Sequence, residues 1–152
     1  MTPRYISQRV IADRLELVDS LLEKTATLPL DGLAQFLADD RNVSAAESNI
    51  RRSLEALMDM GRHILAKGFA SGVTEYKEIV ARLHKHGVLA KPEADLMHMM
   101  AGYRNRLVHL YHEVTEEELY QLAAHHLDDI RHIRDALQQW VEENAHLVRR
   151  DL

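Results

Sequence analysis

Apolar side chains recur every three or four residues along nearly the whole chain, which is the spacing of one face of an α-helix. The first such stripe predicts a helix over about residues 7–27, and the turn-forming sequence LPLDG at residues 28–32 ends it. No sustained alternation of apolar and polar residues bounded by turn signals proposes a strand. The pattern therefore predicts an all-α fold.

Five more helices follow from the same periodicity. A short one carries the apolar positions of residues 33–37. The sequence SAAE at residues 44–47 is a capping box and predicts the start of a long helix that ends at about Lys67. Gly61 lies on the apolar stripe of this long helix and indicates close packing against a neighbour. A shorter helix carries the apolar positions of residues 76–83.

The last two expected helices are long. One begins at Pro92, a residue that suits a first helical turn, and is expected to run to about His112. The other is capped by Thr115 and continues to about Val141. Four substantial helices and two short ones predict an antiparallel four-helix bundle with one or two short extra helices, in a single domain over residues 1–152.

Length and composition agree with one ordinary domain, because 152 residues can bury a core without disulfides. The chain has no Cys, which excludes thiolate catalysis, Cys-ligated zinc and iron–sulfur clusters. It shows neither the apolar stretch of a signal peptide nor a run of membrane-span length, so we expect a cytoplasmic protein with no membrane contact. A formal charge of −5 argues against a broad nucleic-acid-coating face and leaves room for one local site.

The densest polar cluster interrupts the apolar pattern at residues 103–112, in the sequence YRNRLVHLYH. At about 100° per residue, one broad polar sector of a continuous helix would contain Arg104, Asn105, His109 and Tyr111. Arg104 and His109 would lie too far apart around that helix to grip one small atom, unless its last turn unwinds or a second copy of the chain faces the first. A two-fold dimer would meet this condition.

An Arg and a His in one cluster suit the cleavage of an RNA phosphodiester by its own 2′-hydroxyl. The guanidinium is a rigid, permanently charged fork that fits phosphate, and imidazole exchanges a proton near neutral pH. In this interpretation His109 moves the proton and Arg104 neutralises the charge that builds on the phosphorus oxygens, while Asn105 orients the imidazole or donates to the phosphate. No metal or other cofactor is required. A helix end whose polar residues only cap carbonyls and pair with the acidic run at 113–118 is the alternative.

The string RNRLVHLY at residues 104–111 resembles the Arg-x4-His-x-Tyr signature of the HepT group within the HEPN superfamily. The resemblance covers about residues 29–140 and includes the segments 45–52, 55–67, 75–80, 87–89 and 115–120. It implies a HEPN-like helical bundle that dimerises so that two copies of the motif line a shared cleft. It also implies a metal-independent ribonuclease that acts as the toxin of a type VII toxin–antitoxin pair, with an MntA-like nucleotidyltransferase as the antitoxin.

The resemblance assigns roles residue by residue. Arg104 and His109 match the catalytic pair, and Asn105 matches the supporting polar residue after the Arg. Tyr111 matches the acceptor to which the antitoxin transfers AMP from ATP. Because Tyr111 lies beside Arg104 on the helical wheel, a bulky anionic group there would occupy the phosphate site and silence the toxin.

Two other functions stay open on the sequence alone. The same cleft could belong to a non-catalytic module that holds a nucleotide or docks the transferase, or the polar cluster could close the interface of a purely structural dimer. The spacing Glu143-x-x-His146 is that of di-iron bundles but lacks good partner motifs, so we expect no metal centre. The methionines at 97, 99 and 100 are expected to fill the core.

Overall fold

The structure is a computed structural model that describes residues 4–109 and 114–150. That part of the chain forms seven α-helices, one 3-10 turn and two short strands, which confirms the all-α class. Their bounds are α1 (Gln8–Ala26), α2 (Leu33–Leu37), α3 (Asp40–Gly68), α4 (Tyr76–Lys85), α5 (Lys91–Val108), α6 (Glu116–His125), α7 (Leu127–Glu143), η1 (Ala145–Leu147), β1 (Ile6–Ser7) and β2 (Val148–Arg149).

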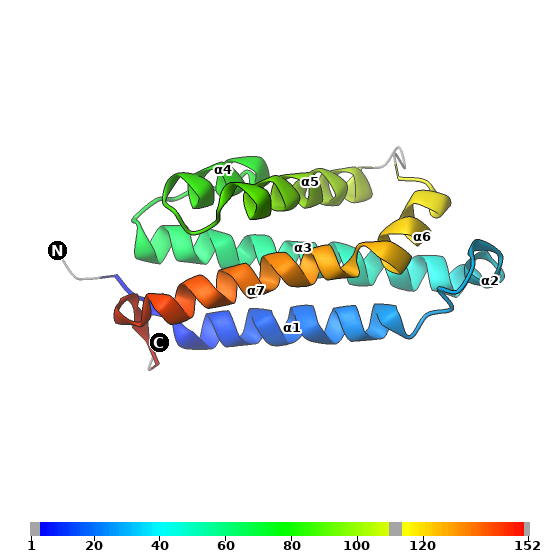
Figure 1. Ribbon diagram of the computed structural model, residues 1–152, viewed down its shortest axis with the longest axis horizontal. Helices are drawn as coiled ribbons and strands as arrows, with labels where there is room; N and C mark the ends of the chain where they lie inside the picture. Colours follow the sequence, from blue (N-terminus) through cyan, green and yellow to red (C-terminus); the bar gives the residue numbers. More distant parts are fainter. Residues whose placement is uncertain (1–3, 110–113, 151–152) are drawn as a thin grey trace.

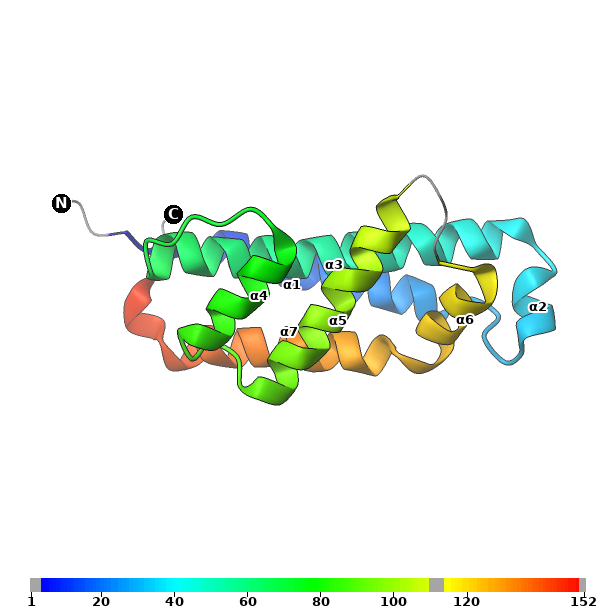
Figure 2. The ribbon, with the colours of Figure 1, turned by 90° about the horizontal axis from the view of Figure 1, so that it is seen from above.

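The four long helices form an antiparallel bundle. Helices α1, α3 and α7 run along the long axis, and α5 crosses obliquely over α3 and α7 (Figure 1, Figure 2). The chain direction reverses from α1 to α3, from α3 to α5 and from α5 to α7. Helix α4 lies beside α5 in the same layer, while α2 and α6 lie toward the end opposite the termini. The described residues thus contain three short helices where one or two were expected.

The predicted stripe of the first helix faces the core. The side chains of Ile11, Leu15, Val18 and Leu22 are all buried. Ser7 caps this helix, because its Oγ accepts a hydrogen bond from the backbone N–H of Val10 at 3.2 Å. Within the described residues, no helix has the length and apolar character needed to cross a membrane.

Three element boundaries differ from the predictions. Helix α3 begins at Asp40 rather than at Ser44, because the carboxylate of Asp39 caps it by accepting the N–H of Arg41. The expected final helix is divided at His126, whose φ of −121° and ψ of 8° leave the helical range. The parallel pair β1–β2 joins the two ends of the described chain, and strands of two residues are too short to show a pattern.

Gly61 brings α4 close to α3, as the sequence predicts. A Cβ atom at this position would lie 2.8 Å from Cδ1 of Leu83 and 3.2 Å from Cγ2 of Ile79. Both of these side chains belong to α4, so any larger residue at position 61 would require them to move. The consequence for the site is that Tyr76, the first residue of α4, lies next to α3 and α5.

Helix α5 buries a face of small and flexible residues: Ala94, Met97, Met100 and Ala101. The expectation that Met99 fills the core is wrong, since its side chain is 45% exposed, whereas that for Met97 and Met100 is confirmed. At about 100° per residue, Met99 lies on the opposite side of the helix from this buried face. Arg104 follows Met97 by seven residues and Ala101 by three, so the same face directs Arg104 toward α3.

Candidate active site at the end of α5

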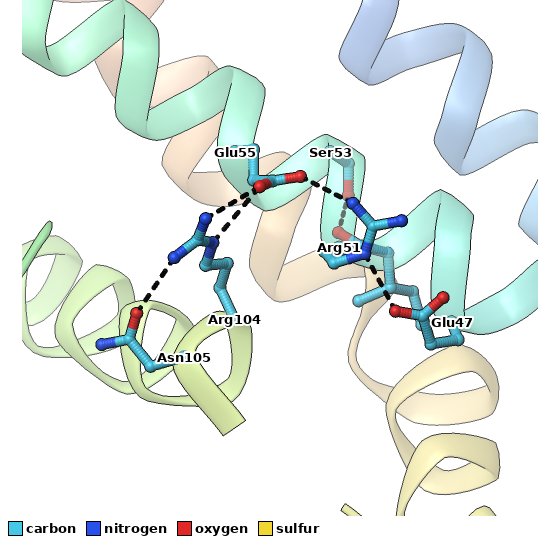
Figure 3. A network of polar contacts seen from close by, with 7 residues as sticks. Glu47, Arg51, Ser53, Glu55, Arg104 and Asn105 are labelled. Atoms are coloured by element: carbon cyan, nitrogen blue, oxygen red, sulfur yellow. Dashed lines mark hydrogen bonds and ion pairs between the residues drawn. The ribbon is translucent and has the colours of Figure 1, made fainter. Parts of the chain in front are cut away.

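Arg104 is held from α3 by a carboxylate (Figure 3). Its Nη2 donates to Oε2 of Glu55 at 3.0 Å, and its Nε donates to the same oxygen at 3.3 Å. The side chains of Arg104 and Glu55 are only 25% and 27% exposed. Two charge-assisted hydrogen bonds in a partly shielded place restrain the guanidinium more than an exposed ion pair would.

Glu55 is shared between two guanidinium groups (Figure 3). Its Oε1 accepts from Nη1 of Arg51 at 3.0 Å, and Nε of Arg51 donates to Oε1 of Glu47 at 2.9 Å. The hydrogen bond to Glu47 raises the pKa of Arg51, burial opposes this, and the charges of Glu47 and Glu55 add to it. With Glu47, the network holds two guanidinium groups and two carboxylates, so Glu55 fixes the position of Arg104 within a set of balanced charges.

A surface hollow of about 350 Å³ lies beside Arg104, lined by Arg62, Thr74, Glu75, Tyr76, Arg104 and Asn105. The Cζ atom of Arg104 lies 4.5 Å from the centroid of the Tyr76 ring, a cation–π contact. Nη1 of Arg104 donates to Oδ1 of Asn105 at 3.4 Å, a long hydrogen bond. Two of the five N–H groups of this guanidinium make no hydrogen bond within the described residues. The hollow can therefore present an oriented cation and spare donors to a phosphate.

His109 lies beyond the helix that carries Arg104. Helix α5 ends at Val108, and His109 has an extended backbone with φ of −75° and ψ of 137°. The prediction that this helix runs to about His112 is wrong, because the backbone has left the helix at His109. The side chain of His109 is exposed and makes no hydrogen bond or ion pair within residues 4–109 and 114–150. The expected AMP acceptor, Tyr111, falls outside the described residues.

An ion pair joins α5 to α6 near the end of α5. Nη1 and Nη2 of Arg106 donate to Oε1 and Oε2 of Glu118, both at 2.8 Å. Thr115 caps α6 as predicted, because its Oγ1 accepts the N–H of Glu118 at 3.1 Å. The backbone has left the helix at His109, and an unwound last turn is one of the two conditions that the helical wheel gives for His109 to approach Arg104.

The structure brings together two of the predicted site residues, Arg104 and Asn105, and adds two that the sequence analysis missed. Glu55 could have been suspected, because Glu47, Arg51 and Glu55 recur at four-residue spacing on one helix face. Tyr76 gives no such signal, since its contact with Arg104 depends on how closely α4 packs against α3.

Metal-binding residues are not grouped in the described part of the chain, where no three His, Asp or Glu side chains are placed to hold one ion. The candidate Glu143 instead accepts a hydrogen bond from Nε2 of Gln139 at 2.9 Å. His146 lies in η1, just past the end of α7.

Comparison with known proteins gives matches over most of the chain. Residues 12–137 match the family model described as HepT-like, ribonuclease HepT-like. The mRNA nuclease HepT of Shewanella oneidensis is 22% identical over 129 residues, which cover 85% of this chain and 96% of that protein. The tRNA nuclease HepT of Aphanizomenon flos-aquae is 25% identical over 139 residues, which cover 89% and 95%.

Solved structures share the fold. A structure of the tri-AMPylated Shewanella oneidensis HEPN toxin in complex with the MNT antitoxin superposes with a TM-score of 0.77 at 22% identity, covering 86% of this chain and 97% of that one. The Bacillus subtilis cytosolic protein YutE, of unknown function, superposes with a TM-score of 0.69 at 19% identity, covering 91% and 94%. The residues matched by the family model include Glu55, Tyr76, Arg104 and His109.

Proposed function

The chain belongs to the HepT-like ribonuclease family, and from this premise we propose that it is a ribonuclease, the toxin of a toxin–antitoxin pair. The relatives named as mRNA and tRNA nucleases support an RNA substrate, which a cytoplasmic protein would meet. The observation that carries the proposal is the guanidinium of Arg104, held by Glu55 and Tyr76 at a surface hollow with donors to spare.

The proposed reaction is attack by the 2′-hydroxyl of the RNA on the adjacent phosphorus. His109 removes the proton from the hydroxyl, the 2′-oxygen bonds to phosphorus, and the bond from phosphorus to the 5′-oxygen breaks. The 5′-oxygen takes up a proton, which leaves a 2′,3′-cyclic phosphate and a 5′-hydroxyl. Arg104 stabilises the charge on the non-bridging oxygens, and Asn105 supports it. This route requires no metal ion.

A second copy of the chain would complete the cleft. The side chain of Val108, the last residue of α5, is 41% exposed, and His109 directly follows it. A homodimer that covers this end of α5 would bring His109 of one protomer toward the Arg104 hollow of the other. A facing second copy is one of the two conditions that the helical wheel gives for these residues to act together, the other being an unwound last turn.

The proposed regulation is adenylylation of Tyr111 by an MntA-like nucleotidyltransferase antitoxin. A solved relative is a tri-AMPylated toxin in complex with its antitoxin, which supports this partner. Tyr111 follows His109 by two residues, so an attached AMP would bring its phosphate near the motif. An adenylyl phosphate that pairs with Arg104 would exclude the substrate from the same guanidinium.

The direct test is RNA cleavage by Arg104→Ala in the presence of a chelator. Loss of a positioned donor to the transition state costs about 10²- to 10³-fold in kcat, so we expect at least that loss. The control is Arg131→Ala, because Arg131 pairs only with Asp128 on the exposed side of α7 and should leave the rate unchanged. A folded Arg104→Ala protein that cleaves RNA at the wild-type rate would refute the proposal. A wild-type protein that binds nucleotide without cleaving RNA would favour the non-catalytic module.

A further inference from the structure

A second hollow adjoins the first along α3. It measures about 370 Å³ and is lined by Val10, Arg14, Asp59, Arg62, His63 and Ala66. Arg62 lines both hollows, so they are neighbours on the surface. Residues of α4 and α5 line the first and residues of α1 line the second, and α3 lies between α4 and α1 in Figure 1. The proposed reaction does not use the second hollow.

The second hollow contains two guanidinium groups and one carboxylate. Asp59 pairs with Arg62 at 3.2 Å through Nη1 and only loosely with Arg14 at 3.9 Å through Nε. The Nε atoms of Arg14 and Arg62 are buried and have no hydrogen-bond partner within the described residues. A ligand in the hollow cannot reach these buried atoms, but the two side chains are 38% and 39% exposed, so their terminal N–H groups can donate to an anionic ligand.

The remaining groups around this hollow leave its charge positive. His63 accepts the backbone N–H of Ser7 through Nε2 at 2.9 Å, so it is a neutral acceptor there. Burial lowers the pKa of His63, and the positive charges of Lys67 and Arg14 lower it further.

The ring of Tyr76 links the two cationic positions. The Cζ atoms of Arg104 and Arg62 lie 4.5 Å and 5.9 Å from its centroid. The carboxylate of Glu75 lines the first hollow. It accepts the N–H groups of Lys77 and Glu78 and so caps α4. Two guanidinium groups on one ring are close enough to bind phosphates of neighbouring nucleotides in a single strand.

We propose that Arg62 and Arg14 form an accessory phosphate site that binds the RNA backbone beside the scissile linkage. The proposal rests on the proposed function, because it extends the substrate path from Arg104. Arginine forks bind phosphate oxygens well, and the shared position of Arg62 makes the path continuous. A strand that occupies both hollows would run across α3 toward α1. This accessory site raises the affinity for the RNA strand and takes no part in the chemical step.

The test compares two substrates, a single-stranded oligonucleotide and a dinucleoside monophosphate that has only the scissile phosphate. For Arg14→Gln, we expect the ratio of kcat/KM for the oligonucleotide to that for the dinucleoside monophosphate to fall about three- to tenfold, and further for Arg14→Gln with Arg62→Gln. Arg14→Lys should restore most of the ratio, since it keeps the charge. Arg131→Gln is the matched control on α7.

A binding measurement separates this inference from the proposed function. In a His109→Ala background, which should not cleave, anisotropy of a labelled single strand gives affinity against salt concentration. Each lost phosphate contact should reduce the slope of log K against log salt by about 0.7. An unchanged slope and an unchanged substrate ratio in the double variant would overturn the accessory site. Equal losses of kcat/KM for both substrates in the double variant would also overturn it. So would a double variant that binds only the antitoxin, and not RNA, more weakly. Suppose the wild-type protein cleaves no RNA, yet its salt slope for binding the strand is steeper than that of the double variant. This outcome would refute only the proposed function.

Discussion

Arg104 and His109, the two motif residues to which the proposed reaction assigns phosphate binding and proton transfer, lie in very different surroundings, although only five positions separate them. Arg104 is inside a helix, partly buried, and held by Glu55 and by the ring of Tyr76. His109 is on extended backbone past the end of α5, exposed and without a hydrogen bond or ion pair in the described part of the chain. Contacts within one chain therefore hold Arg104, whereas in the proposed reaction substrate or a second copy has to position His109.

The largest effect that this contrast predicts is a separation of activity from stability at His109. His109→Ala should lower kcat for RNA cleavage by about 10²- to 10⁴-fold, the usual contribution of a general acid or base. It should leave the melting temperature within error, because the exposed side chain of His109 makes no hydrogen bond or ion pair with residues 4–109 or 114–150. Parallel cleavage assays and thermal melts check this. A large loss of stability would show that His109 has a structural role, which would contradict the contrast with Arg104.

At Glu55 we expect a smaller loss of activity, accompanied by a loss of stability. Glu55→Gln keeps the shape of the side chain but removes the charge that orients Arg104 and satisfies Arg51. We expect about a tenfold loss of kcat together with about 1 kcal/mol of stability, the scale of one or two hydrogen bonds to charged groups. The matched control is Glu47→Gln, which alters the Arg51 end of the network without touching Arg104. Equal losses of kcat in both variants would contradict a specific role of Glu55.

The smallest predicted effect is on the pH dependence of stability, and it concerns His63, which lies away from Arg104 and His109. Burial lowers the pKa of His63 below 6.5, so the unfolded chain binds its proton first as the pH falls. The stabilising contribution of His63 is thus complete above about pH 6.5 and is lost as the pH falls below that value. His63→Gln should flatten part of the decline of the melting temperature between neutral and acidic pH. An unchanged decline would show that other groups account for it.

Much of the fold follows from local rules that operate within one stretch of sequence. The spacing of apolar residues, the cap at Thr115 and the glycine at position 61 each predict what is observed. The misplaced start of α3 at Ser44 has a local cause, because Asp39 offers a competing cap five residues earlier. Two caps close together in sequence cannot be ranked without knowing which turn the tertiary packing favours.

The candidate site was predictable only where its residues are neighbours in sequence. Arg104 and Asn105 follow from the motif, but the rotation of α5 that turns Arg104 inward depends on how alanines and Met97 pack against α3. The end of α5 at Val108 also differs from the prediction of about His112. The contacts of α5 with α3 join residues that are far apart in sequence, so a local pattern does not predict them.

The central claim is that Arg104 and His109 act together on one phosphodiester across two copies of the chain. The most direct measurement mixes Arg104→Ala protein with His109→Ala protein, confirms mixed dimers by native mass spectrometry, and follows RNA cleavage. Each variant alone should be inactive, and the mixed dimer should recover cleavage, because one Arg104 and one His109 then face each other across the interface. Mixed dimers that form and remain as inactive as either parent would contradict the account.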